Sequence, residues 1–217
     1  MKIFNLGSRC CSLYLCDVRE IGSDFADRLD FLPLSRREKV LAAARSVRTD
    51  NNARLEYAAG LLLFRHLGVH SDDDLIISAT GKPYLSQISG SPIHFSLSHS
   101  GNYAVLAVSD RPLGVDIEMI KPYRPKVAQR VFSREELFFL DNGTSDSGYD
   151  RENSDIDARF FFLWTRLEAA LKINGEGIAA YSSRSFSLLD TDDSTAFKTA
   201  YHDGHIISVS MHKNDIL

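Results

Sequence analysis

The stretch 114–120, Gly-Val-Asp-Ile-Glu-Met-Ile, places Asp116 and Glu118 two positions apart inside an apolar run. In a β-strand successive side chains point to opposite faces, so the two carboxylates share one face with Cα atoms roughly 7 Å apart. Neighbouring carboxylates repel each other unless a cation lies between them. A hard divalent cation such as Mg²⁺ prefers oxygen ligands. The pair therefore fits either a metal site or the wet face of a half-buried strand.

Glu168 and Lys172 form a second pair of groups that could act together. They are four residues apart in the segment 158–175, which we expect to be a helix ended by Gly175. Residues with this spacing lie on the same face of a helix, so the acid and the amine would be neighbours. The same spacing is typical of a surface ion pair, which stabilises a helix by about 0.2–0.5 kcal/mol. Spacing alone leaves both interpretations open.

The stretch 95–101, Phe-Ser-Leu-Ser-His-Ser-Gly, contains the adjacent residues Ser98 and His99. Apolar and polar residues alternate before the glycine, which predicts a strand followed by a polar turn. The stretch has no G-x-S-x-G sequence, the pattern typical of a hydrolase nucleophile. The serine and histidine therefore do not by themselves indicate a hydrolase.

Two short basic segments are candidates for anion binding. Arg36 and Lys39 lie in Ser-Arg-Arg-Glu-Lys, a sequence that is also typical of a solvated helix start. Lys82 lies in the turn Gly-Lys-Pro at 81–83, which is too short for a P-loop because that motif needs four residues between its first glycine and Gly-Lys-Ser/Thr. Neither segment defines a site alone.

These residues must be held in place by a mixture of helices and strands. Apolar spacing and capping residues predict helices over 35–46, 52–68, 133–140 and 158–175. Strand material is expected over 1–6, 11–18, 74–85, 93–109, 112–120 and 197–211. Within these elements, Ser133 and Glu136 have the spacing of a capping box, and Asp203-Gly204 suits a type I′ hairpin turn.

Composition excludes several classes of protein. The 217 residues are 44% hydrophobic and 25% charged with a net charge of −4, so the basic excess of a nucleic-acid-binding protein is absent. The longest apolar run, 58–64, is too short to span a membrane, and no secretory signal is evident, so we expect a cytoplasmic protein. Its three cysteines form neither a disulfide framework nor a zinc site. The acidic stretch 141–157 is expected to be a surface loop.

Read together, these segments resemble the Sfp-type 4′-phosphopantetheinyl transferases from about residue 35 to about residue 190. The segments are GKP at 81–83, FSLSHSG at 95–101, GVDIE at 114–118, FSREE at 132–136 and WTRLEAALKINGEG at 164–177. The resemblance implies transfer of 4′-phosphopantetheine from coenzyme A to a serine of an apo acyl or peptidyl carrier protein, with Mg²⁺ as cofactor and release of 3′,5′-ADP.

The resemblance also implies the fold and the role of each half. It implies an α+β chain of two similar, pseudo-symmetric α/β halves, with coenzyme A bound between them. The N-terminal half, 1–112, is then expected to bind coenzyme A, and the C-terminal half, 113–217, to carry the metal and catalytic residues. A monomer is expected that acts on coenzyme A and a carrier protein, with no nucleic-acid or membrane partner.

Site residues follow position by position from the same resemblance. The implied metal ligands are Asp116, Glu118 and Glu168. The implied coenzyme A contacts are Arg36, Lys39, Lys82, Pro83, Ser98, His99 and Lys172. The implied catalytic residues are Glu168, Lys172 and His99, with either Glu168 or a metal-bound water as the base for the serine proton. Glu136 matches the acid of the F-S-x-x-E segment.

Two positions depart from the family pattern. Leu167 stands where a lysine usually precedes the helical glutamate, and either it flanks the proposed site or it packs beneath the helix near Trp164. Glu56 stands nine residues before Arg65, where an arginine is common, so this position lacks the basic side chain that would contact the nucleotide.

Two other functions also fit the acidic residues. One is a different Mg²⁺-dependent phosphoryl-transfer or hydrolytic enzyme that uses the same acids. The other is a non-catalytic homologue that binds coenzyme A or a carrier protein without turnover.

Overall fold

The computed structural model describes residues 2–5, 11–45, 50–86, 92–143, 155–175, 177, 186–189 and 195–212. Its helices and antiparallel sheets confirm the α+β class. The chain divides into two compact units, Met1–Arg111 and Pro112–Leu217, called unit 1 and unit 2 below.

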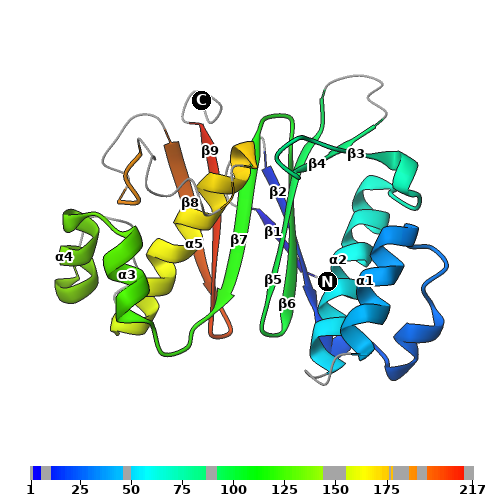
Figure 1. Ribbon diagram of the computed structural model, residues 1–217, viewed down its shortest axis with the longest axis horizontal. Coiled ribbons are helices and arrows are strands. Elements are labelled where there is room, and N and C mark those ends of the chain that lie inside the picture. Colours follow the sequence, from blue (N-terminus) through cyan, green and yellow to red (C-terminus); the bar gives the residue numbers. More distant parts are fainter. Residues whose placement is uncertain are drawn as a thin grey trace. The chain divides into compact units, whose positions relative to one another are not determined.

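Unit 1 is built on an antiparallel sheet with the strand order β1-β2-β6-β5 (Figure 1). Its strands are β1 (Lys2–Asn5), β2 (Cys11–Asp17), β5 (His94–Ser100) and β6 (Tyr103–Ser109). A separate two-stranded sheet pairs β3 (Leu75–Ile77) with β4 (Pro83–Leu85). β6 is paired on both sides and is almost entirely buried, so it forms the centre of the unit.

Two helices of unit 1, α1 (Leu34–Arg45) and α2 (Asp50–Leu67), lie side by side (Figure 1). The apolar face of α2, which includes Leu55 and Leu62, packs with Phe95 and Leu106 of the sheet. The helix ends as predicted at Gly68, whose φ of 69° suits a residue without a side chain. Short 3₁₀ turns occur at Val18–Glu20, Ser23–Asp27 and Asp72–Asp74.

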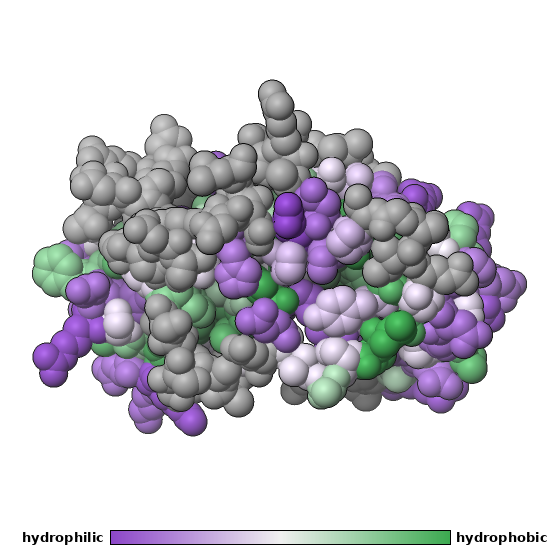
Figure 2. Space-filling view, turned by 90° about the horizontal axis from the view of Figure 1, so that it is seen from above, coloured by the Kyte–Doolittle hydropathy of each residue, from purple (hydrophilic) through white to green (hydrophobic). Residues whose placement is uncertain are grey.

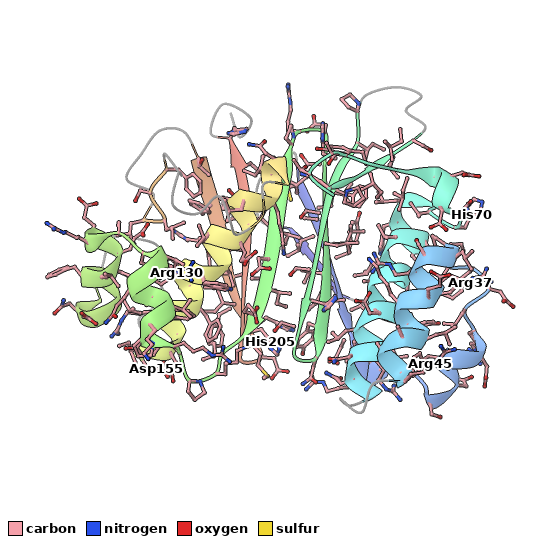
Figure 3. All side chains as sticks on the ribbon, viewed as in Figure 1. Arg37, Arg45, His70, Arg130, Asp155 and His205 are labelled. Carbon is pink, nitrogen blue, oxygen red and sulfur yellow. The ribbon has the colours of Figure 1, made fainter. Side chains whose placement is uncertain are left out.

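Unit 2 packs one long helix, α5 (Ile156–Asn174), on a three-stranded antiparallel sheet with the order β7-β9-β8 (Figure 1). The strands are β7 (Leu113–Met119), β8 (Thr195–His202) and β9 (His205–His212). The turn between β8 and β9 has positive φ angles at Asp203 (46°) and Gly204 (71°), as a type I′ turn requires. His205, labelled in Figure 3, follows this turn at the start of β9.

Two shorter helices complete the described part of unit 2: α3 (Pro125–Val131) and α4 (Arg134–Asn142). α5 begins after Asp155, whose carboxylate accepts a hydrogen bond from the Ala158 N–H (2.6 Å; Asp155 is labelled in Figure 3). It ends at Gly175, as predicted, in a left-handed conformation. The acidic stretch 141–157 lies largely outside the described residues, since 144–154 are not described.

Hydrophilic residues and small hydrophobic patches alternate on the face shown in Figure 2. Within the described ranges, no helix is both long and apolar enough to cross a membrane. Cys11 and Cys16 are both buried.

Glu136 is a buried acid that joins two segments of unit 2. It completes the predicted capping box, because its carboxylate accepts from the Ser133 N–H (2.8 Å) while the Ser133 hydroxyl accepts from the Glu136 N–H. Its other oxygen accepts from the Leu188 N–H (3.0 Å), and Leu188 is fully buried in the core. Glu136 therefore ties the start of α4 to the segment 186–189.

We expect Glu136→Ala to lower the free energy of unfolding by about 2–4 kcal/mol, because it leaves the buried Leu188 N–H and the partly buried Ser133 N–H without their acceptor. Chemical denaturation of both variants measures the loss. Glu135→Ala, at an exposed position of the same helix, is the matched control and should cost less than about 0.5 kcal/mol. Equal losses in the two variants would contradict this role for Glu136.

Candidate functional site

The close approach of α5 to β7 at Gly114 brings the candidate residues of unit 2 together. A Cβ atom on Gly114 would overlap the carbonyl oxygen of Ala169 and lie 3.0 Å from the Cβ of Lys172. Side chains two positions apart in a strand share a face, so Asp116 and Glu118 point to the same side as Gly114, toward α5. The missing side chain at Gly114 therefore lets the acids of the strand meet the charged residues of the helix.

Lys172 forms an ion pair with Asp116. Its Nζ donates to Asp116 Oδ1 (2.7 Å) and to the backbone oxygen of Val115 (3.2 Å). Asp116 is only 4% exposed, so the interpretation of a wet strand face is wrong at this position. The pair joins α5 to β7 and is not the surface pair within one helix that the Glu168/Lys172 spacing also allowed.

Glu168 lies in the same electrostatic environment. Burial raises the pKa of its carboxyl group above the ordinary value, and the nearby charges of Asp116 and Glu118 raise it further, while Lys172 acts in the opposite direction. Glu118 is half-buried and has Lys121 Nζ at 3.7 Å from Oε2. Together, Asp116, Glu118, Glu168 and Lys172 form what we call the acidic cluster.

The acidic cluster supplies the oxygen ligands that Mg²⁺ prefers, and their mutual repulsion is the kind that a divalent cation relieves. The donor set therefore fits the predicted metal. As the side chains stand, however, the described part of the chain contains no group of three His, Cys, Asp or Glu residues arranged to hold a metal ion. Metal binding by Asp116, Glu118 and Glu168 remains a prediction.

Leu167 belongs to the hydrophobic core, not to the site. It is fully buried among the apolar residues that line α5, which decides between the two positions considered for it. Its neighbour Arg166 is also buried: its guanidinium donates to Thr199 Oγ1 (3.0 Å) and to the Leu188 carbonyl (2.7 Å) and lies over the ring of Phe162. Arg166 therefore has a structural role and does not replace the missing lysine.

In unit 1, Arg36 and His99 converge on Glu56, and we call these three residues the Arg–Glu–His cluster. Arg36 Nη1 donates to Glu56 Oε2 (2.8 Å), and His99 Nε2 lies 3.5 Å from Glu56 Oε1. The hydrogen bond from His99 and the charge of Arg36 lower the pKa of Glu56 to about 2, although burial acts in the opposite direction. Glu56 therefore carries a full negative charge at neutral pH.

Gly60, one helical turn after Glu56 on α2, gives Arg36 its position. A Cβ atom on Gly60 would lie 2.6 Å from Leu32 Cδ2 and 2.9 Å from Arg36 Cγ, so the stem of Arg36 lies directly on the backbone of α2. The Arg36 head group reaches Glu56 from there.

The remaining predicted residues of unit 1 lie outside this cluster. Lys82 is buried and burial lowers its pKa to about 8, while its Nζ lies 5.8 Å from the centre of the Tyr84 ring. Pro83 is the first residue of β4, and Lys39 is exposed on α1. The predicted turn at Ser98 and His99 is wrong: β5 continues to Ser100, and both residues belong to the strand.

The sequence analysis did not predict two features: the role of Gly114 in admitting α5, and the use of Glu56 as the partner of Arg36 and His99. For Gly114 the signal was a glycine inside an apolar strand, which often marks a close approach of another backbone. For Glu56 the only signal was its difference from the family pattern.

We expect Gly114→Ala to destabilise the protein by about 1–3 kcal/mol, because the added methyl group must push α5 away from β7. The same displacement should lengthen the contact between Lys172 and Asp116. Denaturation measures the first effect and a crystal structure the second. Met119→Ala, at the exposed end of β7, is the control. A variant as stable as the wild type would refute the close approach.

Leu167→Lys should destabilise the fold by about 3–5 kcal/mol, because it places an unpaired ammonium group in the core. Thermal and chemical denaturation test this directly. Leu167→Met keeps the volume and the apolar character and should cost less than about 1.5 kcal/mol. If the lysine variant were as stable as the methionine variant, Leu167 would have to face solvent.

Comparison with known proteins gives a consistent result for unit 2. Residues 112–214 match the sequence model of the 4′-phosphopantetheinyl transferase superfamily. The segment matched begins and ends within unit 2 and contains the whole acidic cluster.

Individual relatives carry related names. The chain is 40% identical over 116 residues to 4′-phosphopantetheinyl transferase psf-1 of Bacillus pumilus, a match that covers 54% of this chain and 45% of the relative. It is 33% identical over 99 residues to 4′-phosphopantetheinyl transferase Sfp of Bacillus subtilis strain 168, covering 46% and 40%. With HetI of Nostoc it shares 35% over 116 residues, covering 52% and 46%. Each match spans less than half of the relative's length.

Proposed function

Because residues 112–214 match the sequence model of the 4′-phosphopantetheinyl transferase superfamily, we propose that this chain belongs to that superfamily and transfers 4′-phosphopantetheine from coenzyme A to a serine of an apo acyl or peptidyl carrier protein. The observation that carries the proposal is the acidic cluster, in which three carboxylates and one ammonium group gather where α5 meets β7. The names of the relatives support it, because each is a 4′-phosphopantetheinyl transferase.

Unit 2 supplies the groups that handle the pyrophosphate of coenzyme A. Asp116, Glu118 and Glu168 would hold Mg²⁺, which when bound supplies positive charge that screens the pyrophosphate. Lys172 is already held at Asp116, and its ammonium group can donate to a phosphate oxygen at the same position. The cluster thus combines anionic ligands for a cation with a cationic donor for an anionic substrate.

In the transfer step, the serine oxygen forms a bond to the β-phosphorus of coenzyme A, and the bond from that phosphorus to the bridging oxygen breaks. The leaving group departs as 3′,5′-ADP. The hydroxyl proton needs an acceptor, and we assign it to Glu168. Glu168 is a carboxylate of the acidic cluster, and a carboxylate held beside the reacting phosphate can take up such a proton. Lys172 stabilises the negative charge that develops on the phosphates.

Unit 1 supplies the residues proposed to contact the nucleotide part of coenzyme A: Arg36, Lys39, Lys82, Pro83, Ser98 and His99. We assign Arg36 and Lys39 to the 3′-phosphate, and Ser98 and His99 to the phosphates of the nucleotide, the 3′-phosphate included. The assignment is supported by the convergence of Arg36 and His99 on one carboxylate, that of Glu56.

The proposal includes a relationship between the two units as similar halves. Its support is that a long helix packs on an antiparallel sheet in each unit, α2 in unit 1 and α5 in unit 2. A monomeric, cytoplasmic enzyme is part of the same proposal.

Incubation of the protein with coenzyme A, Mg²⁺ and an apo carrier protein tests the function. Mass spectrometry of the carrier should show one added phosphopantetheine, and chromatography should show an equal amount of 3′,5′-ADP. Release of nucleotide without a change in carrier mass would indicate a hydrolase instead. Binding of coenzyme A or carrier without either product would indicate a non-catalytic homologue.

Asp116→Asn should lower the transfer rate by about 100-fold or more, because it removes a negative ligand and the charged partner of Lys172. The variant should stay folded, since the side chain of Lys172 is 31% exposed and can turn to solvent. Rates at saturating coenzyme A measure the loss of transfer, and thermal melting shows whether the variant is still folded. Asp110→Asn is the control at an exposed position. A near-normal rate for Asp116→Asn at limiting Mg²⁺ would remove this residue from the site.

A further inference from the structure

In the Arg–Glu–His cluster of unit 1, Arg36 and His99 are groups that could bind an anion, and the carboxylate of Glu56 lies against both of them. Each carboxylate oxygen of Glu56 faces a different group, Oε2 the guanidinium of Arg36 and Oε1 the imidazole of His99. Two donors of this kind on two oxygens of one group are what a phosphate monoester also requires. The carboxylate of Glu56 therefore stands where a phosphate group of a ligand would bind.

Glu56 competes well for this position because it stays ionised. Its pKa of about 2 keeps the carboxylate negative throughout the neutral range. The contact with Arg36 is also partly shielded from water, with side-chain exposures of 18% for Arg36 and 23% for Glu56, so its attraction is screened less than that of a surface pair. A ligand must replace this contact before it can use Arg36 and His99.

The packing shows which partner is free to move. The stem of Arg36 lies close against Gly60, and the backbone of His99 is held in β5, where it pairs with Ala104 of β6. Glu56 is held by its contacts with Arg36 and His99, and rotation about its side-chain bonds can turn its carboxylate away from both. Displacement therefore moves Glu56 away and leaves Arg36 and His99 in place.

We propose that Glu56 is a specificity-determining residue that occupies the anion-binding position between Arg36 and His99 and weakens the protein's preference for ligands with a 3′-phosphate. The inference rests on the proposed function, because the ligand is the nucleotide part of coenzyme A. Its consequence is that the protein prefers nucleotides with a 3′-phosphate over nucleotides without one less strongly than it would if Glu56 did not occupy the position between Arg36 and His99.

Calorimetric titration with two probes measures this directly. Adenosine 3′,5′-bisphosphate carries the 3′-phosphate, and adenosine 5′-phosphate lacks it. In Glu56→Gln we expect affinity for the bisphosphate to rise about tenfold, the usual value of one charge-assisted contact, while affinity for the monophosphate stays within about twofold. Equal gains for both probes, or no gain for either, would overturn the proposal.

Glu38→Gln is the matched control. Glu38 is exposed on α1, and its substitution changes the net charge by the same amount. It should leave the ratio of the two affinities unchanged. A ratio that rises as much in Glu38→Gln as in Glu56→Gln would show a general charge effect and overturn the role of Glu56.

The wild-type protein offers a second measurement that needs no variant to fold. The ¹³C resonance of the Glu56 side-chain carboxylate should shift on titration with adenosine 3′,5′-bisphosphate and stay unchanged with adenosine 5′-phosphate. A resonance that stays constant at saturation with the bisphosphate would show that Glu56 is not displaced.

These measurements separate the inference from the proposed function, because neither uses a carrier protein or turnover. If the protein modifies the carrier but the ratio of its affinities for the two probes is the same in wild type and Glu56→Gln, the proposed function stands and the role of Glu56 is refuted. If the carrier stays unchanged but the ratio of the two affinities rises in Glu56→Gln as expected, the role of Glu56 stands and the proposed transferase function is refuted. Failure of the wild type and of Glu56→Gln to bind either probe refutes both.

Discussion

The close approach of α5 to β7 at Gly114 is the constraint on which the acidic cluster depends. A side chain at that position would meet the Ala169 carbonyl and the stem of Lys172, so the helix could not lie where it does. With the helix close, Lys172 reaches Asp116 and the Val115 carbonyl across the gap between two elements. The ion pair is buried on the aspartate side, where loss of one partner is costly because it leaves a charge without compensation.

The rest of unit 2 holds this arrangement in place. Leu167 and the aromatic residues of α5 pack on the side of the helix that faces the core, while Glu168 and Lys172 remain half-buried. Arg166 ties the helix to β8 and to the Leu188 carbonyl, and Glu136 ties the Leu188 N–H to the start of α4. These buried polar contacts fix the position of α5 along the sheet, which in turn determines which acids of β7 its charged residues meet.

The acidic cluster of unit 2 and the Arg–Glu–His cluster of unit 1 contain opposite proportions of carboxylates and hydrogen-bond donors. In unit 2, three carboxylates gather around Lys172, and their repulsion adds to the effect of burial in raising the pKa of Glu168. In unit 1, a guanidinium and an imidazole gather around Glu56 and lower its pKa to about 2. An excess of carboxylates suits a hard cation, and a pair of hydrogen-bond donors that includes a guanidinium suits a phosphate. Both clusters match a reaction in which a magnesium ion and an anionic coenzyme take part, which is the chemistry proposed for this chain.

The sequence by itself determined most of the elements. Apolar spacing and capping residues predicted α2 with its end at Gly68, the capping box of Ser133 and Glu136, the turn at Asp203-Gly204 and the end of α5 at Gly175. These features depend on residues within one or two turns of one another, so local spacing is sufficient to predict them. The pairing of Asp116 with Glu118 on one strand face follows in the same way.

Only the tertiary structure decided which partner each charged side chain takes. Spacing offered Glu168 as the neighbour of Lys172, but its ion pair is with Asp116, 56 positions away; Arg36 pairs with Glu56, 20 positions away. The tertiary structure also placed Leu167 in the core, and it placed Ser98 and His99 within a strand. The physical reason is that such contacts depend on the distance between packed elements. That distance is set at single positions, such as Gly60 and Gly114, where the absence of a side chain lets another segment approach.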